Sequence, residues 1–362
     1  MSIKPKILHI APANTSGVPG QFVQTERQLG YDSRLVTLFR DPRDYYSDIC
    51  LDLPFINFAP VKWMKRLVSD PKKLVVLNRA PQPESIPLYW QPHSFFEKLL
   101  VNARDRFWRP GIERAIRQYH LDQFDVYQLD GGLDFYRNAS FICEMKARGK
   151  KIMCCYTGSD LRTRGLIKKI DDISSVNLTV EFDHIQLHPN IHHVFFPFDA
   201  KRFESREREH EEKCPVRIGH APTNRAAKGS DIIIPILNEL ASRYNVEIEL
   251  IEGLTYQEAL RRKRSCDIFV DQIGDLGYGI NSLEAMAMGI PACSCLAPGF
   301  AELYPDHAFV EIDAENLAEK LIPLIKDVAM RRSIGERGRS WVEVHHDPIK
   351  VVKKIHEIAG IQ

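Results

Sequence analysis

The stretch from 277 to 291 contains the residues whose types and spacing point most directly to chemistry. A glycine-rich turn opens a short predicted helix, and Glu284 lies about one turn inside it. Gly289 and Pro291 end the helix, because glycine tolerates the left-handed turn after a helix and proline cannot continue one. The helix start offers unpaired N–H groups and a positive dipole end, which suit phosphate, whereas the carboxylate suits sugar hydroxyls. This element can therefore hold both halves of a nucleotide; the alternative is a buried helix with a glycine turn.

Two cations in the loop 224–229 form a second candidate site. Arg225 and Lys228 follow the predicted strand 216–220 and precede a helix that Ser230 can cap. An arginine grips a diphosphate through its planar guanidinium, and a lysine adds a point charge. The alternative is a pair of solvated surface side chains. The position directly after a strand favours phosphate binding.

The candidate residues lie in a chain in which apolar runs alternate with helical patterns. The predicted strands are 6–10, 33–38, 125–129, 151–156, 178–180, 192–196, 216–220, 247–251, 266–270, 292–296 and 309–311. Such alternation predicts a parallel sheet with helices on both faces. Ligands of open α/β sheets bind beyond the carboxyl ends of the strands. The loops at those ends are 15–20, 130–132, 158–160, 223–229, 271–272 and 277–284, and they would line one cleft if two halves face each other.

Length and composition favour two soluble domains. The chain has 362 residues and a net charge of +1, so no overall field favours nucleic acid. We expect a first domain over 1–200, a charged linker over 201–214, a second domain over 215–345 and a C-terminal helix over 346–362. Eight scattered cysteines without zinc spacing, and no long apolar run, indicate a cytoplasmic protein.

Residues 57–118 interrupt the alternating pattern and are rich in proline, tryptophan and basic residues. We expect a helical basic insert of the first domain here. Such an insert can contact a membrane surface, which would make the protein peripheral at the inner membrane face, or an anionic acceptor. The alternative is a segment packed on one side and solvated on the other.

The order of these motifs resembles that of the family 4 glycosyltransferases, which have the GT-B fold. The similarity covers most of the chain, and its specific parts are 220–229 and 277–291; weaker parts are the glycine loop near the start, 157–162 and 197–203. The resemblance implies two Rossmann-like domains facing across a cleft, with the C-terminal helix packing back on the first. It also implies a nucleotide-diphosphate sugar as donor, bound mainly by the second half.

The resemblance assigns roles to individual residues. Arg225 and Lys228 match the pair that holds the diphosphate, and Glu284 matches the second Glu of the family's Glu–seven residues–Glu motif, which takes the ribose hydroxyls. The backbone amides of the phosphate-binding turn match Gly279, Ile280 and Asn281. The first-domain loop that approaches the diphosphate and acceptor matches Gly17, although this loop lacks a full dinucleotide-binding spacing.

The sequence departs from the family pattern at the first Glu of that motif. Leu276 occupies the position, so Asp271 at the strand end, or Asp275, is the candidate substitute. The usual histidine before Gly158 is also absent, since Thr157 stands there. Specificity for the donor sugar is therefore expected to depend on this position.

The expected reaction is a metal-independent transfer to an acceptor hydroxyl, retaining at the anomeric carbon, in the synthesis of a polysaccharide or glycoconjugate. Cations and a helix start would neutralise the leaving diphosphate. Asp160, Asp130 and Ser159 are the acceptor-side candidates, and glycans, lipid-linked molecules or small molecules are the candidate acceptors. No metal or other cofactor is expected, and the cluster of Glu181, Asp183, His184 and His188 is interpreted as surface or packing residues. The alternatives are a sugar-nucleotide 2-epimerase of the same fold and a degenerate nucleotide-sugar-binding partner.

Overall fold

The computed structural model describes residues 4–41, 45–54, 87–92, 94–158, 160–205, 214–274 and 277–362. The chain divides into two compact units: 1–197 together with 348–362, and 198–347. The first part of the predicted insert, the middle of the predicted linker, Ser159, Asp275 and Leu276 lie outside the described residues.

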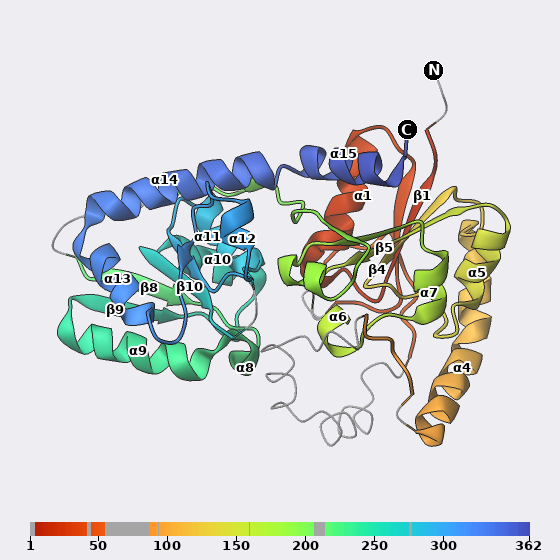
Figure 1. Ribbon diagram of the computed structural model, residues 1–362, viewed down its shortest axis with the longest axis horizontal. Helices are drawn as coiled ribbons and strands as arrows, with labels where there is room; N and C mark the ends of the chain where they lie inside the picture. The colour runs from red at the N-terminus through yellow and green to blue at the C-terminus, as the bar shows by residue number, and fades with distance from the viewer. Residues whose placement is uncertain are drawn as a thin grey trace. The chain divides into compact units, whose positions relative to one another are not determined.

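The described strands of the first unit form a seven-stranded parallel sheet in the order β3-β2-β1-β4-β5-β6-β7 (Figure 1). The strands are β1 Ile7–Ala11, β2 Ser33–Thr37, β3 Ile49–Cys50, β4 Val126–Asp130, β5 Lys151–Tyr156, β6 Val176–Thr179 and β7 Ile191–His193. β5 is buried over its last five residues, as a continuous apolar run between covering helices should be.

Helices cover both faces of this first sheet. They are α1 Val18–Gln28, α4 Phe95–Tyr119, α5 Ser140–Ala147, α6 Asp160–Thr163, α7 Lys168–Ile173 and α15 Pro348–Ala359, with short 3-10 turns at Thr15–Gly17 and Phe182–Gln186. α1 and α15 pack together on one face, and α5 packs with α7 on the other (Figure 1). The C-terminal helix therefore belongs to the first unit, and α4 is the described helix of the predicted insert.

The second unit contains a five-stranded parallel sheet in the order β12-β11-β10-β8-β9. Its strands are β8 Val216–His220, β9 Val246–Leu250, β10 Ile268–Gln272, β11 Ala292–Ser294 and β12 Val310–Glu311. Its helices are α8 Arg225–Lys228, α9 Ser230–Arg243, α10 Tyr256–Arg264, α11 Ile280–Ala287, α12 Phe300–Leu303, α13 Leu317–Lys326 and α14 Val328–His345, after a 3-10 turn at Ala200–Arg202.

Two layers of helices enclose the second sheet. α9 and α13 pack together on the face whose core includes Ile233, Leu237 and Leu321, and α10 and α11 lie over the other face (Figure 1). Two parallel α/β sheets confirm the predicted fold class. The predicted strands at 151–156 and 216–220 coincide with β5 and β8, whereas the two-residue β3 was not predicted.

Candidate functional site

The candidate site lies beyond the carboxyl ends of β8 and β10, and α8 is the first element that contributes to it. Asn224 caps this short helix, because its Oδ1 accepts from the backbone N–H groups of Ala226 and Ala227 at 3.1 and 3.3 Å. Gly229 follows with a φ of 70°, and a Cβ there would lie 2.6 Å from the side chain of Ile273. The glycine thus lets α8 pack against the segment after β10, which brings the loop 224–229 to the end of that strand.

Lys228 is the cation that this packing buries. Its Nζ donates to Asp271 Oδ1 at 2.9 Å and to Gln272 Oε1, and its side chain is 13% exposed. Burial alone would raise the pKa of Asp271, but Lys228 and hydrogen bonds from Ser282 and Gly279 outweigh it and lower that pKa. Lys228 therefore lies at the strand ends as half of a buried ion pair.

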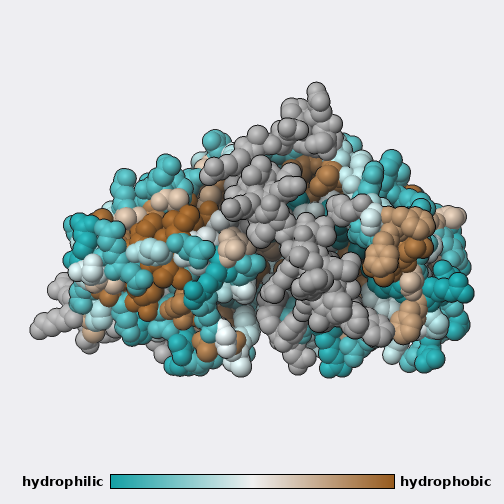
Figure 2. All heavy atoms as spheres, turned by 90° about the horizontal axis from the view of Figure 1, so that it is seen from below, coloured by the Kyte–Doolittle hydropathy of each residue, from teal (hydrophilic) through white to brown (hydrophobic). Residues whose placement is uncertain are grey.

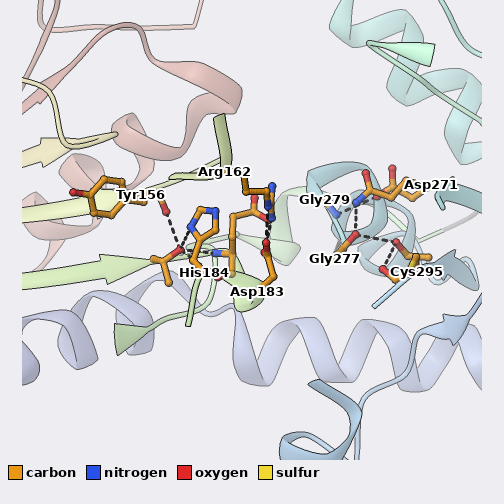
Figure 3. A network of polar contacts seen from close by, with 12 residues as sticks. Tyr156, Arg162, Asp183, His184, Asp271, Gly277, Gly279 and Cys295 are labelled. Carbon is orange, nitrogen blue, oxygen red and sulfur yellow. Dashed lines mark hydrogen bonds and ion pairs between the residues drawn. The ribbon is translucent and has the colours of Figure 1, made fainter. Parts of the chain in front are cut away.

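The start of α11 meets the same pair. The N–H of Gly279 donates to Asp271 Oδ2 at 3.1 Å, and a Cβ on Gly279 would lie 3.4 Å from the Lys228 ammonium. Figure 3 shows Asp271, Gly277 and Gly279 in this arrangement. Of the three amides predicted to face a phosphate, Gly279 is thus bound by Asp271. The amides of Ile280 and Asn281 lie in the first helical turn, where no described residue accepts from them.

Arg225 is more loosely held than Lys228. Its guanidinium makes two hydrogen bonds to Glu252, at 2.8 and 2.6 Å, and its side chain is 52% exposed. The hydrogen bonds and the charge of Glu252 raise the pKa of Arg225. Because an exposed ion pair contributes little to stability, Arg225 can exchange this carboxylate for another anion.

Glu284 is buried rather than open to solvent. One of its oxygens accepts from the ammonium of Lys263, and the other accepts from the Tyr256 hydroxyl at 3.0 Å. Both partners lie on α10. The predicted ribose-binding carboxylate is therefore present at the expected helix, but protein groups occupy both its oxygens. Asp271, the candidate substitute for the missing first Glu, caps α11 and pairs with Lys228.

Gly17 lies before α1 in the first unit, at the carboxyl end of β1. Its φ is 74°, and a Cβ there would lie 3.4 Å from the Tyr45 ring. A side chain at this position would be strained, so the backbone turn requires glycine.

Asp130 and Asp160 occupy different environments at the ends of β4 and β5. Asp130 is 2% exposed, and its oxygens face Gln128 Nε2 at 3.0 Å and His9 Nδ1 at 3.4 Å. Asp160 begins α6 with a side chain that is 36% exposed, near Arg164. Burial and the charge of Asp130 raise the pKa of Asp160, although Arg164 opposes the shift. Of these two carboxylates, only Asp160 is exposed enough to contact a ligand.

Glu181, Asp183, His184 and His188 each have a partner in the first unit, and for His188 it is Asp171, whose Oδ1 lies 3.1 Å from its Nε2. Arg162 donates to both Asp183 oxygens and to Glu181, and His184 Nδ1 lies 2.8 Å from Thr179 Oγ1 (Figure 3). Burial lowers the pKa of His184 to about 3. In the part of the chain that the structure describes, no three His, Cys, Asp or Glu side chains are grouped as metal ligands. Arg162, from the segment 157–162, holds this network together.

Several residues of the second unit's site were not predicted from the sequence. They are Gln272 as a partner of Lys228, Glu252, Tyr256 and Lys263. The last two lie seven residues apart on α10 and so share one helical face. Thr255 caps α10, whose last turn is basic, and in the sequence only the seven-residue spacing between Tyr256 and Lys263 indicates that this lysine is buried.

Comparison with known proteins connects this geometry to a family. The family model described as glycosyl transferases group 1 matches residues 237–341, which contain β10, α11 and both Glu284 partners. A GDP-mannose-dependent monoacylated alpha-(1-6)-phosphatidylinositol monomannoside mannosyltransferase of Corynebacterium glutamicum is 25% identical over 199 residues. That match covers 43% of this chain and 52% of the relative, so it spans about half of the curated protein's length.

Solved structures of glycosyltransferases match nearly the whole chain in fold. Sucrose-phosphate synthase of Thermosynechococcus elongatus has a TM-score of 0.56 at 12% identity, covering 98% of both chains. Anabaena HepE in complex with UDP and glucose has a TM-score of 0.57 at 12% identity, covering 98% of this chain and 99% of that one. At such low identity these two matches bear on the fold alone. Residues 237–341 thus resemble the glycosyl transferases group 1 domain, and the chain as a whole has the GT-B fold.

Proposed function

We propose that this protein transfers a sugar from a nucleotide-diphosphate sugar to an acceptor hydroxyl. The observation that carries the proposal is the meeting of Lys228, Asp271 and the start of α11 within hydrogen-bonding distance at one edge of the second sheet. A cation beside the first turn of a helix is an arrangement that binds phosphate oxygens. Both elements lie at the carboxyl ends of β8 and β10, where ligands of parallel sheets bind.

The second unit would hold the donor. Lys228, Arg225 and the amides of Ile280 and Asn281 would receive the diphosphate, whose charge grows as the bond to the sugar breaks. Arg225 would leave Glu252 to do so, and Glu284 would receive the ribose. This donor set supplies positive charge without a metal ion, which supports the metal-independent transfer that the sequence resemblance implies.

The first unit would hold the acceptor, with Asp160 as the carboxylate that orients the attacking hydroxyl. In a retaining transfer the acceptor oxygen attacks from the face that the diphosphate leaves. The departing phosphate oxygen is then adjacent and can take the acceptor's proton, so this mechanism requires no further side chain as base. Ser159 remains a candidate for the same role, but it lies outside the described residues.

A lipid-linked acceptor in the synthesis of a cell-surface polysaccharide or glycoconjugate is the acceptor class that we favour. The Corynebacterium relative is named as acting on a phosphatidylinositol monomannoside. No described helix combines the length and the apolar character that crossing a membrane requires. An enzyme that glycosylates such a lipid must reach the membrane surface, and a peripheral contact provides this.

We assign that peripheral contact to the N-terminal half of α4. Phe95, Phe96, Leu99 and Leu100 are 75%, 60%, 48% and 41% exposed, and Figure 2 shows apolar side chains gathered over this helix, at the right. They lie opposite the face that packs on the core, which includes Trp108 and Ile112. Lys98 and Arg106 are exposed on the same half of α4, so the matching partner is an anionic lipid surface.

Co-sedimentation with vesicles tests this membrane contact. We expect the protein to bind vesicles with an anionic lipid more tightly than neutral ones. Replacing Phe95 and Phe96 by serine should weaken that binding by about tenfold or more, because each phenylalanine loses burial worth about 1.5–3 kcal/mol. Leu303→Ser, at a 59% exposed position of α12, is the matched control and should bind as the unmodified protein does. Equal binding by all three proteins would contradict the assignment.

A panel of UDP-, GDP- and ADP-sugars tests the proposed activity. A donor at 100 times its dissociation constant should stabilise the protein by about 2.7 kcal/mol in a thermal-shift experiment. Incubation with that donor and lipid-linked acceptors should then release the nucleoside diphosphate. An epimerised nucleotide sugar without acceptor would support the 2-epimerase alternative, and binding without turnover would support the degenerate partner. Absence of binding to every nucleotide sugar would overturn the proposal.

A further inference from the structure

Lys263 is a buried lysine within the nucleotide-binding region. It is 1% exposed on α10, and its ammonium donates to Glu284 Oε2 and to Asn281 Oδ1, the latter at 2.8 Å. The ammonium also lies 4.8 Å from the centre of the Phe269 ring. A buried ammonium is costly unless it is paired and hydrogen-bonded, and these contacts provide both. The position of Glu284 is therefore set by a residue of a different helix.

The two oxygens of Glu284 have different surroundings. Oε2 faces inward to Lys263, whereas Oε1 accepts from the hydroxyl of Tyr256 at 3.0 Å. Tyr256 is the first residue of α10 and is 37% exposed. The outer oxygen of the carboxylate is thus covered by a side chain that already lies partly in solvent.

Resting on the proposed function, we propose that Lys263 positions Glu284 to select the ribose of the donor nucleotide, and that Tyr256 occupies the place of a ribose hydroxyl until the nucleotide binds. Lys263 fixes Glu284 through the inner oxygen. Tyr256 donates to the outer oxygen in the place that a ribose hydroxyl takes when the nucleotide binds. Tyr256 is displaced outward in that exchange, and Lys263 remains.

The chemistry of the exchange explains why a ribonucleotide would be selected. A ribose hydroxyl and a phenol are both O–H donors, so replacing one by the other keeps a hydrogen bond to Glu284 Oε1. A deoxynucleotide displaces the tyrosine but returns no donor, and a buried carboxylate oxygen is then left without one. Lys263 increases this penalty because it prevents Glu284 from turning toward solvent.

The same ammonium acts on the phosphate end of the site. Asn281 and Glu284 lie three residues apart and therefore on one face of α11. Asn281 is held from two sides, since its Oδ1 accepts from Lys263 and its Nδ2 donates to the carbonyl of Ala221 at 3.1 Å. Lys263 is thus a positioning residue for the first turn of α11 as well as for the ribose carboxylate.

Calorimetric titration with UDP and GDP and with their 2′,3′-dideoxy analogues tests the inference. The readouts are the two dissociation constants and their ratio. Lys263→Met should reduce the preference for the ribonucleotide by about tenfold, since a hydrogen bond to a charged group is weakened. Tyr256→Phe should bind the ribonucleotide and the dideoxy analogue several-fold more tightly and leave their ratio unchanged, because neither ligand then has to displace the phenol hydroxyl.

Lys326→Met and Tyr244→Phe are matched controls, because these two side chains contact each other elsewhere in the second unit. Both should keep the dissociation constants and the ratio of the unmodified protein. If Lys263→Met does not fold, Tyr256→Phe alone tests the exchange, and dissociation constants equal to those of the unmodified protein would overturn it. An unchanged ratio in a folded Lys263→Met, with nucleotide binding retained, would overturn the inference but not the proposed function. Absence of any nucleotide binding to the unmodified protein would overturn both.

Discussion

Arg225 and Lys228 lie three residues apart but are held in different ways before a ligand binds. Lys228 is paired with a buried carboxylate and can add a ligand oxygen without leaving Asp271, since an ammonium has three donors. Arg225 makes both of its short contacts to Glu252, so the same donors must change partner to grip a diphosphate. Glu252 therefore competes with the ligand for Arg225.

Removing Arg225 and removing Glu252 should have opposite effects on nucleotide binding. Arg225→Ala should lower turnover by about tenfold to a hundredfold, since it removes charge that stabilises the leaving diphosphate. Glu252→Ala should leave turnover intact and tighten nucleotide binding, because it frees the guanidinium. Both melting temperatures should stay near that of the unmodified protein, because the pair is exposed. Steady-state kinetics and titration measure these effects, and equal losses in both variants would show that the ion pair acts only in structure.

The sequence allowed the meeting of Lys228 and Gly279 to be anticipated, because their segments follow strands of one predicted parallel sheet. The partners of Glu284 could not be predicted in the same way. Lys263 lies 21 residues earlier in the chain, and only the packing of α10 against α11 brings it to that carboxylate. Likewise, the burial of Asp130 depends on His9 of the neighbouring strand, a contact that no local pattern shows.

At the scale of elements, α11 is fixed by a close approach of α14. A Cβ on Gly335 of α14 would lie 2.0 Å from the carbonyl oxygen of Gly289, which follows α11. One turn further along α14, a Cβ on Gly338 would meet only the flexible side chain of Met286, at 3.3 Å. The first contact fixes the end of α11, whereas the second leaves room for adjustment.

Alanine at these two glycines should therefore have different consequences. Gly335→Ala should destabilise the second unit by about 1–3 kcal/mol, because the methyl group meets backbone that must shift. Gly338→Ala should be near neutral, because alanine's better helix propensity, about 1 kcal/mol, offsets a small side-chain movement. Urea unfolding of the two variants compares these values, and similar midpoints would contradict the role assigned to Gly335.

Helices and strands with a clear apolar pattern could be predicted from the sequence. Elements whose length or exposure depends on the elements packed against them could not. α11 ends just before Gly289, as predicted for the helix that contains Glu284, since glycine and proline mark its limit. β3 has two residues, too few to show a period. The exposed apolar half of α4 resembles a packing face in sequence, because periodicity cannot tell which of two apolar faces has a partner.

At the scale of the whole molecule, the first unit is completed by a segment that follows the second unit in sequence. His356 of α15 lies with Nε2 at 3.1 Å from Glu26 Oε1, and His9 Nε2 lies 2.9 Å from Glu26 Oε2. Burial alone would lower the pKa of His9, but Glu26 and Asp130 outweigh it and raise the pKa to about 10. Burial likewise opposes the ionised form of Glu26, yet the two histidines lower its pKa to about 2.

This buried cluster should make the stability of the first unit depend on pH at both ends. The raised pKa of His9 contributes stability that is complete below pH 6.5 and is lost as the pH rises through about 10. The lowered pKa of Glu26 contributes stability that is present above pH 4.5 and is lost as the pH falls toward about 2. The contribution is therefore greatest between pH 4.5 and 6.5.

Urea midpoints measured across this range check the expectation. His9→Gln should remove the alkaline loss of stability, whereas His345→Gln, a partly exposed histidine paired with Asp306, should retain it. In a proton NMR titration the His9 ring should remain protonated through neutral pH. A His9 ring that loses its proton near its ordinary pKa of 6.5 would contradict the ion-pair arrangement.

The route of the chain also orders events during synthesis on the ribosome. The second unit is one continuous segment and has all its strands once residue 347 has emerged. The first unit must wait for α15, so during translation Glu26 lacks His356 and the face of α1 that contacts this helix stays uncovered. A nascent chain that stalls inside the second unit thus displays an unfinished first unit, the species that chaperones and proteases recognise.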